Sequence, residues 1–267
     1  MSVQTLYTAA TGMESLQTKL DVIANNLANV NTTGYKQSRA NFEDLFYRQE
    51  KLPGADDGNG SLTPTGIAIG LGTRVSSTQT NFRQGAFQQS SNPLDIAIEG
   101  RGFFQVTDTD GNTVYTRAGN FSLNNNGDIV MGSANSGRLL EPSINIPETA
   151  TGIVISNNGM VEYRNEGDTS LSQAGQIQLA TFANPEGLLK LGDSLYQETD
   201  ASGGAQINNP GEGGAGLVRQ NALEASNVEP VQELIDLITT QRAFELNGQT
   251  VQAGDQILQL IANLRRF

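Results

Sequence analysis

The chain has 267 residues, a formal net charge of -12, and no cysteine, histidine or tryptophan. The lack of cysteine and histidine excludes disulfides, the usual zinc ligand sets and serine–histidine catalysis. An acidic chain also argues against nucleic acid and anionic membranes as partners, because both require a basic face. No apolar run approaches the ~18 residues of a membrane span, and no secretory signal is recognisable at the N-terminus. We expect a protein that stays inside the cell or leaves it by another export route.

A seven-residue apolar repeat runs through the first thirty residues and predicts a helix. The repeat has two rows, the second three residues after the first: Leu6, Met13, Leu20 and Leu27, then Ala9, Leu16, Ile23 and Val30. Two rows at this spacing are the a and d positions of a coiled-coil seam. Asn25, Asn26 and Asn29 lie off the seam, either on a solvated back face or as amides that bond to neighbouring subunits. Gly34 provides a left-handed cap after the helix.

Residues 37–93 change character and predict an extended arm. Residues 53–60 have the composition of a loop. After it, apolar residues alternate with alanine or glycine, which gives a strand with one nearly bare face on which another backbone could lie closely. The members of this pattern are Gly66, Ile67, Ala68, Ile69, Gly70, Leu71 and Gly72.

Residues 94–221 predict an antiparallel β domain. Alternating apolar residues begin at Leu94, and three turn dipeptides follow at Asp110-Gly111, Asn126-Gly127 and Asn158-Gly159. Such dipeptides supply the positive φ angles that hairpins need.

A second long helix is predicted at the C-terminal end. Ser226 and Glu229 have capping-box spacing, and Pro230 suits the first turn. One apolar row repeats every seven residues, at Leu237, Phe244, Val251 and Leu258. Its expected companion row, at positions 241, 248 and 255, is Gln, Gly and Asp.

The pattern as a whole predicts an α+β fold with three domains. Residues 1–36 and 222–267 would pair as a coiled-coil stalk, residues 37–93 would form an inserted arm or β hairpin, and residues 94–221 would form the antiparallel all-β domain.

Two terminal motifs resemble the bacterial flagellar rod and hook proteins. The N-terminal motif contains Asn25, Asn26, Asn29, Gly34 and Tyr35, and the C-terminal motif contains Asn227, Pro230, Gln241 and Arg242. Residues 64–72 of the arm are most similar to the distal rod member of that family. The family usually has an acidic residue in place of Ala118 and tyrosine in place of Phe244, which puts single surface contacts in doubt.

The resemblance implies a structural subunit of the distal rod, not an enzyme, with no cofactor or metal. It implies self-assembly into a hollow helical shaft that carries torque from motor to hook, located in the basal body across the periplasm. It further implies a homo-oligomer whose partners are proximal rod proteins, hook protein, surrounding ring proteins and the flagellar type III export apparatus. No nucleic acid binding and no direct membrane insertion are expected.

Three alternatives remain at this point. The first is a proximal rod or hook protein of the same family, distinguished by the arm. The second is a carbohydrate-active enzyme that uses paired carboxylates on the β domain, although no carboxylate pair lies in a recognisable motif. The third is a surface adhesin, which would be expected to carry a secretory signal.

Overall fold

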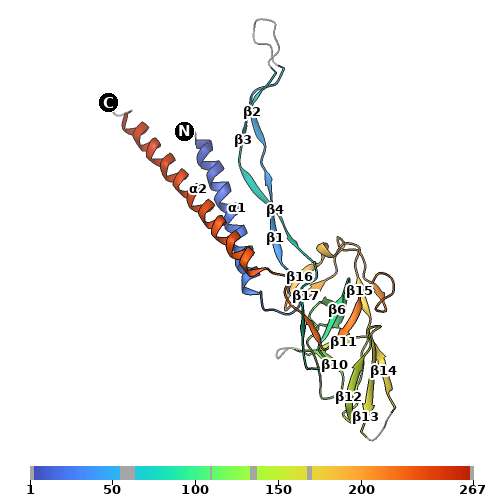
Figure 1. Ribbon diagram of the computed structural model, residues 1–267. Coiled ribbons are helices and arrows are strands. Elements are labelled where there is room, and N and C mark those ends of the chain that lie inside the picture. The colour runs from blue at the N-terminus through green and yellow to red at the C-terminus, as the bar shows by residue number, and fades with distance from the viewer. Residues whose placement is uncertain (1–2, 55–63, 109, 133–136, 167–169, 265–267) are drawn as a thin grey trace. The chain divides into compact units, whose positions relative to one another are not determined.

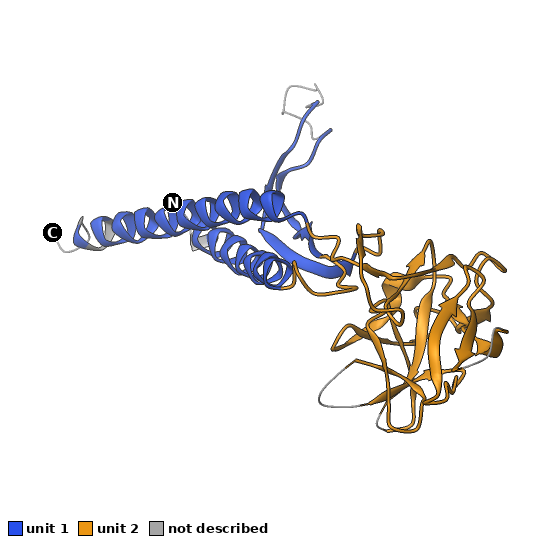
Figure 2. Ribbon diagram, turned by 60° about the horizontal axis from the view of Figure 1, so that its bottom comes forward, with its two compact units in different colours: residues 1–28, 38–80, 229–267 blue, residues 29–37, 81–228 orange. Residues whose placement is uncertain are grey.

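A computed structural model describes residues 3–54, 64–108, 110–132, 137–166 and 170–264. The chain divides into two compact units, drawn in blue and orange in Figure 2. Unit 1 contains residues 1–28, 38–80 and 229–267, and unit 2 contains residues 29–37 and 81–228. The chain therefore passes between the units four times. Within the described residues, neither helix is long and apolar enough to cross a membrane.

Unit 1 contains two α-helices and a long two-stranded ribbon (Figure 1). The helices are α1 (Val3–Ala28) and α2 (Pro230–Leu264). In the ribbon, β1 (Ser38–Asp44) pairs antiparallel with β4 (Thr73–Thr80), and β2 (Tyr47–Lys51) pairs antiparallel with β3 (Ile67–Gly70). α1 contacts β1 and β4.

Unit 2 is built of short antiparallel strands. Its largest sheet has the order β16-β17-β8-β7-β11-β10-β9, with β15 pairing to β7 and β18 pairing to β15; β12, β13 and β14 form a second sheet, and β19–β6 and β20–β5 form two pairs. The bounds are β5 Phe87–Gln89, β6 Ile96–Glu99, β7 Phe103–Thr107, β8 Thr113–Thr116, β9 Phe121–Leu123, β10 Ile129–Met131, β11 Arg138–Glu141, β12 Ala150–Ile155, β13 Met160–Asn165, β14 Ser172–Gln176, β15 Leu179–Thr181, the 3-10 helix η1 Pro185–Gly187, β16 Leu189–Gly192, β17 Leu195–Gln197, β18 Gln206–Asn208, β19 Leu217–Gln220 and β20 Ala222–Glu224.

The three predicted hairpin turns of unit 2 have the backbone that their dipeptides require. Gly111, Gly127 and Gly159 have φ angles of 79°, 84° and 78°. Each glycine lies between two antiparallel strands, in the pairs β7–β8, β9–β10 and β12–β13. The antiparallel β part of the expected fold is therefore present.

The core of unit 2 has two apolar clusters. The larger one includes the fully buried side chains of Ile96, Ile98, Phe104, Leu140 and Leu179. The smaller one is aromatic and consists of Phe103, Tyr115, Ala180, Phe182, Leu188 and Tyr196, with Phe82 packed against it. Edge-to-face ring contacts hold the side chains of this second cluster in place, and one side of the cluster lines a small pocket.

The prediction of an α+β fold organised by a coiled-coil stalk is wrong. The described residues are mostly strands of antiparallel sheets, with α1 and α2 as their two α-helices, and they contain no extended coiled-coil stalk. The two helices do lie side by side and antiparallel (Figure 1). Their contact, however, is not a seam of two apolar rows.

The reason is the polarity of the α2 row that faces α1. Two rows of α2 turn towards α1. One is the apolar row. The other contains Glu233, Thr240, Asn247 and Gly254, which lie three and four residues from their apolar neighbours. The companion row expected at positions 241, 248 and 255 is therefore displaced by one residue from the row that faces α1, at positions 240, 247 and 254. A coiled coil needs apolar knobs in both rows, and here one row is polar or lacks a side chain.

The seam residues predicted from the sequence are accordingly only partly covered. Ala9 and Ile23 are buried. The other predicted seam residues are half-buried: Leu6, Met13, Leu16, Leu20, Leu27, Val30, Leu237, Phe244, Val251 and Leu258. Val30 lies beyond the end of α1, in the turn that begins unit 2.

The arm residues form the β2–β3 part of the ribbon. Ile67 and Ile69 are exposed on β3, while a Cβ on Gly66 would collide with Lys51 O and one on Gly70 would touch the Tyr47 ring. The bare face of the strand is thus covered by its own hairpin partner.

Gly72 lets the ribbon approach α1 closely. Its φ of 126° is strongly disfavoured for residues with a side chain, and a Cβ there would collide with Thr11 Oγ1 of α1. Thr11 Oγ1 also lies 3.5 Å from the Thr73 amide nitrogen, which donates to it.

We predict that Gly72→Val loosens the ribbon from α1, because it adds both backbone strain and a collision with Thr11. The combined cost is about 2 kcal/mol or more. Amide hydrogen exchange at Thr73 and its neighbours on β4 should accelerate. Gly54→Val is the matched control, because Gly54 also has a positive φ, of 82°, but open space around it. Equal exchange rates in the two variants would show that the contact with α1 is unimportant.

Candidate functional site

A buried carboxylate lies in unit 2, at the end of β20. The side chain of Glu224 is fully buried. Its Oε1 accepts a hydrogen bond from Lys36 Nζ at 2.6 Å and from the Gly85 amide at 2.9 Å. Its Oε2 accepts one from Arg117 Nη1 at 3.3 Å. One anion therefore pairs with two buried cations from different parts of the chain.

The two cations are also tied to backbone carbonyls. Lys36 Nζ donates to Arg83 O at 2.9 Å, and Arg117 Nη2 donates to Gly100 O at 2.7 Å. Burial lowers the pKa of the Lys36 ammonium, and the charge of Glu224 opposes this shift. Burial likewise lowers the pKa of Arg117, although a guanidinium stays protonated at neutral pH. The cluster thus holds charge in the interior at a desolvation cost that its hydrogen bonds must offset.

Asn227, from the predicted C-terminal motif, joins the same segments beside this cluster. Its Oδ1 accepts from the Gln37 amide at 2.8 Å. Its Nδ2 donates to Asn81 O at 2.8 Å and to Arg83 O at 2.9 Å. A single buried amide therefore connects the end of the segment 29–37 to the start of the segment 81–228, and it does so from close to the end of that second segment.

Gly34 and Tyr35, from the N-terminal motif, lie next to these groups. Gly34 has a φ of 70°, and a Cβ there would come within 2.6 Å of the Ala118 nitrogen. Its amide donates to the Glu224 carbonyl at 2.8 Å. The ring of Tyr35 lies under the Lys190 ammonium, which is 5.5 Å from the ring centroid. The structure therefore brings Gly34, Tyr35 and Asn227 together from opposite ends of the sequence.

The asparagines of the N-terminal motif have different surroundings. Asn26 is buried, and it exchanges two hydrogen bonds with the Ser38 backbone, from Nδ2 to O at 2.8 Å and from N to Oδ1 at 2.9 Å. Asn26 Nδ2 also lies 3.3 Å from Glu233 Oε1 of α2. Asn25 is exposed and Asn29 is half-buried. The Asn26 amide is thus used within its own chain, where it fixes the start of the ribbon against both helices.

The remaining predicted residues of the C-terminal motif belong to α2 in unit 1. Pro230 is the first residue of α2, where its missing amide donor is not needed. Gln241 and Arg242 are exposed on α2. In the described part of the chain, no group of three acidic residues is arranged to hold a metal ion.

Comparisons with known proteins match this chain along nearly its whole length. Family models for the flagella basal body rod protein, the flagellar hook protein FlgE/F/G D1 domain and the flagellar basal body rod FlgEFG protein C-terminal region match residues 6–36, 97–163 and 219–264. The flagellar basal-body rod protein FlgG of Caulobacter vibrioides is 44% identical over 98% of this chain and 100% of its own. The chain belongs to the FlgG family of flagellar basal-body rod proteins.

Two further relatives separate the members of the wider rod and hook group. FlgG of Bacillus subtilis is 40% identical over 99% of this chain and 100% of its own length. The flagellar hook-basal body complex protein FlhP of the same organism is 30% identical over 98% of this chain and 100% of its own. The greater similarity to FlgG confirms the predicted resemblance to a rod protein and its place in the basal-body rod.

Sequence reasoning missed the charged residues at the centre of this FlgG-family site. None of Lys36, Arg117 and Glu224 was among the site residues predicted from the sequence. A signal did exist for Glu224, because Ala222 and Glu224 are both buried on β20 and share one face of it. An acidic residue in the buried phase of a short strand indicates a buried partner of opposite charge.

We predict that Glu224→Gln destabilises unit 2 strongly, because it leaves two buried cations without their anion. The expected loss is about 3 to 5 kcal/mol in the free energy of unfolding. Urea unfolding followed by tyrosine fluorescence would measure it, since Tyr115 and Tyr196 lie in the core of this unit.

Glu212→Gln provides the matched control, because Glu212 is an exposed glutamate of the same unit whose carboxylate accepts a hydrogen bond from the Asn209 side chain. Its effect should stay within about 0.5 kcal/mol. If both variants unfolded at the same urea concentration, Glu224 would not hold unit 2 together.

Proposed function

We propose that this protein is a structural subunit of the distal part of the flagellar rod and not an enzyme. Copies of the chain assemble into a hollow helical shaft that carries torque from motor to hook. The family membership supports the rod assignment. The observation that carries the assembly is an exposed apolar face on α2.

The exposed face of α2 lies opposite its contact with α1. Its apolar residues are Val231, Leu234, Ile235 and Ile238, which are 45 to 71% exposed, with Leu246 and Leu260 further along at 62%. At 100° per residue, these positions fall on one side of the helix and Glu233, Thr240 and Asn247 fall on the other. We name the residues 231, 234, 235 and 238 the outer stripe of α2.

An outer stripe of this kind requires a partner. A surface helix normally has one apolar face, and apolar residues on two opposite faces are typical of a helix that is covered on both sides. Burying each of these side chains would contribute about 1.5 to 3 kcal/mol. Repeated along a polymer of identical copies, such contacts resist sliding between subunits, which is what a torque-carrying shaft needs.

The ribbon offers a second surface for neighbouring subunits. Tyr47, Ile67 and Ile69 are 53%, 50% and 38% exposed on the β2–β3 hairpin, and Phe46 beside them is 88% exposed. A group of apolar side chains on an isolated hairpin is typical of an interaction site. In the proposed shaft this hairpin packs against an adjacent copy.

Further partners follow from the same proposal. In the basal body, the shaft would join proximal rod proteins at one end and hook protein at the other, within surrounding ring proteins. The subunits would reach it through the flagellar type III export apparatus. Support for these partners comes from the family and not from a particular contact of this chain.

We predict that Ile235→Asp prevents polymer formation while leaving the monomer folded. The side chain is already 49% exposed in the single chain, so the monomer loses little, whereas an interface would have to bury an unpaired charge. Circular dichroism would check the fold, and electron microscopy would check for polymers.

The control is Thr250→Asp, which places the same charge at an exposed position of α2 outside the outer stripe. The Thr250→Asp variant should polymerise like the parent chain. Normal polymers from Ile235→Asp would exclude the outer stripe from the subunit interface.

A further inference from the structure

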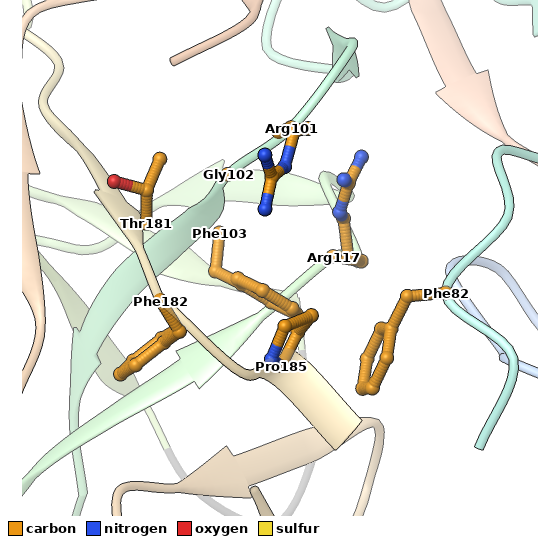
Figure 3. Close-up of a pocket in the computed structure, with 8 residues that line it drawn as sticks. All are labelled: Phe82, Arg101, Gly102, Phe103, Arg117, Thr181, Phe182 and Pro185. Atoms are coloured by element: carbon orange, nitrogen blue, oxygen red, sulfur yellow. The ribbon is translucent and has the colours of Figure 1, made fainter. Parts of the chain in front are cut away.

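A small pocket of about 100 Å³ opens on the aromatic cluster of unit 2 (Figure 3). Phe103 lies at its centre, with Phe82, Phe182 and Pro185 around it. Phe103 meets the Phe82 ring at 5.4 Å and the Phe182 ring at 5.7 Å between centroids, both edge to face. These contacts fix the apolar wall of the pocket.

The polar wall of the pocket consists of two guanidinium groups, those of Arg101 and Arg117, which Figure 3 shows on the same side of the Phe103 ring. Arg101 is exposed, and no described residue forms an ion pair with it. Arg117 is 4% exposed, with its Cζ 5.4 Å from the Phe103 ring centroid. Two positively charged guanidinium groups thus border a cavity with an apolar side.

The charge of the neighbouring cluster is unbalanced. Glu224 is the anion for both Lys36 and Arg117, so the buried cluster carries one more positive than negative charge when all three are ionised. In addition, Arg117 Nε is buried and has no hydrogen-bond acceptor among the described residues. Buried donors without acceptors are rare in folded proteins, and each needs a specific explanation. An anion in the adjacent pocket would supply both the acceptor and the missing charge.

The size of the pocket selects among anions. About 100 Å³ corresponds to the liquid volume of roughly three waters. This is enough for a carboxylate and one or two methylene groups, and too small to enclose a nucleotide. A carboxylate is also the planar acceptor that matches a guanidinium, and the methylene groups would lie against the rings.

We propose that this pocket binds a carboxylate on a short aliphatic stem, and that in the polymer the carboxylate is an aspartate or glutamate side chain of a second copy of the chain. The second part rests on the proposed function. The chain supplies 28 acidic residues against 16 basic ones, so copies that approach each other present mostly like charges. A cationic pocket on this acidic chain gives the approaching copy one attractive position. The pocket therefore fixes how one copy is placed against the other, as well as adding to their affinity.

Glutarate is a suitable probe for the first part, with glutaramide as its uncharged counterpart. In the full chain labelled with ¹⁵N, the Nε–H resonances of Arg101 and Arg117 should shift on titration with glutarate. They should not shift with glutaramide or with sodium chloride at the same ionic strength. Arg101→Gln should weaken glutarate binding about tenfold or more, since one charge-assisted donor is lost. Arg164→Gln, at an exposed arginine of β13, should leave it unchanged.

Two results would overturn the carboxylate site. One is the absence of any shift of these resonances at saturating glutarate. The other is an equal shift with chloride, which would mean an adventitious ion only.

The second part is tested by photo-crosslinking in the polymer. Thr181, an uncharged residue of the pocket lining, is replaced by p-benzoylphenylalanine, and copies labelled with ¹⁴N and ¹⁵N are mixed before assembly. Mass spectrometry should find a mixed-isotope adduct on a peptide segment that contains aspartate or glutamate, and the same replacement at Arg164 should not give that adduct. Adducts within one copy alone would overturn the second-copy assignment. The glutarate titration measures binding to the pocket in the unassembled chain. If the proposed function is wrong but the pocket binds carboxylates, glutarate still binds and only the crosslink between copies is missing.

Discussion

The ion pairs of Glu224 are the constraint on which unit 2 depends. The chain enters or leaves this unit at four points, after residues 28, 37, 80 and 228. Lys36, the Gly85 amide and Glu224 itself lie within a few residues of three of these points, and they meet at one carboxylate. Since the partners are up to 188 residues apart in sequence, their pairing closes long loops of chain around a single buried group.

This arrangement suits a structural subunit of the rod. A buried ion pair contributes little net stability compared with an apolar contact, but removing one partner is costly because a charge is left unpaired. The segments of unit 2 beside the crossing points are therefore held together. Moving one of them away would leave a buried charge without its partner. Asn227 adds to this by holding Gln37, Asn81 and Arg83 through three hydrogen bonds of one amide.

Unit 1 follows a different principle. Its helix α2 has a half-buried apolar row and a polar row towards α1, and an apolar outer stripe on the opposite side. Isolated helices of this length gain most of their stability from packing, so a helix with two apolar faces is incomplete in the single chain. In the proposed polymer, neighbouring copies would cover this exposed apolar surface.

The sequence by itself determined the features that depend on local rules. The motifs at the two ends identified the family, the glycine dipeptides of unit 2 located its hairpin turns, and the apolar periodicities located both long helices. These signals concern residues within a turn or two of each other, where steric rules on φ and the repeat of a helix or strand decide the outcome. The tertiary structure alone decided which faces meet. Next to Leu237, either Thr240 or Gln241 could belong to the second row of a heptad repeat. Only the packing of α2 on α1 decides for Thr240, whose row is polar and does not form an apolar seam. In the same way, nothing near Glu224 in the sequence names Lys36 or Arg117 as its partners, because ion pairing depends on distance in space and the chain brings these residues together only by folding.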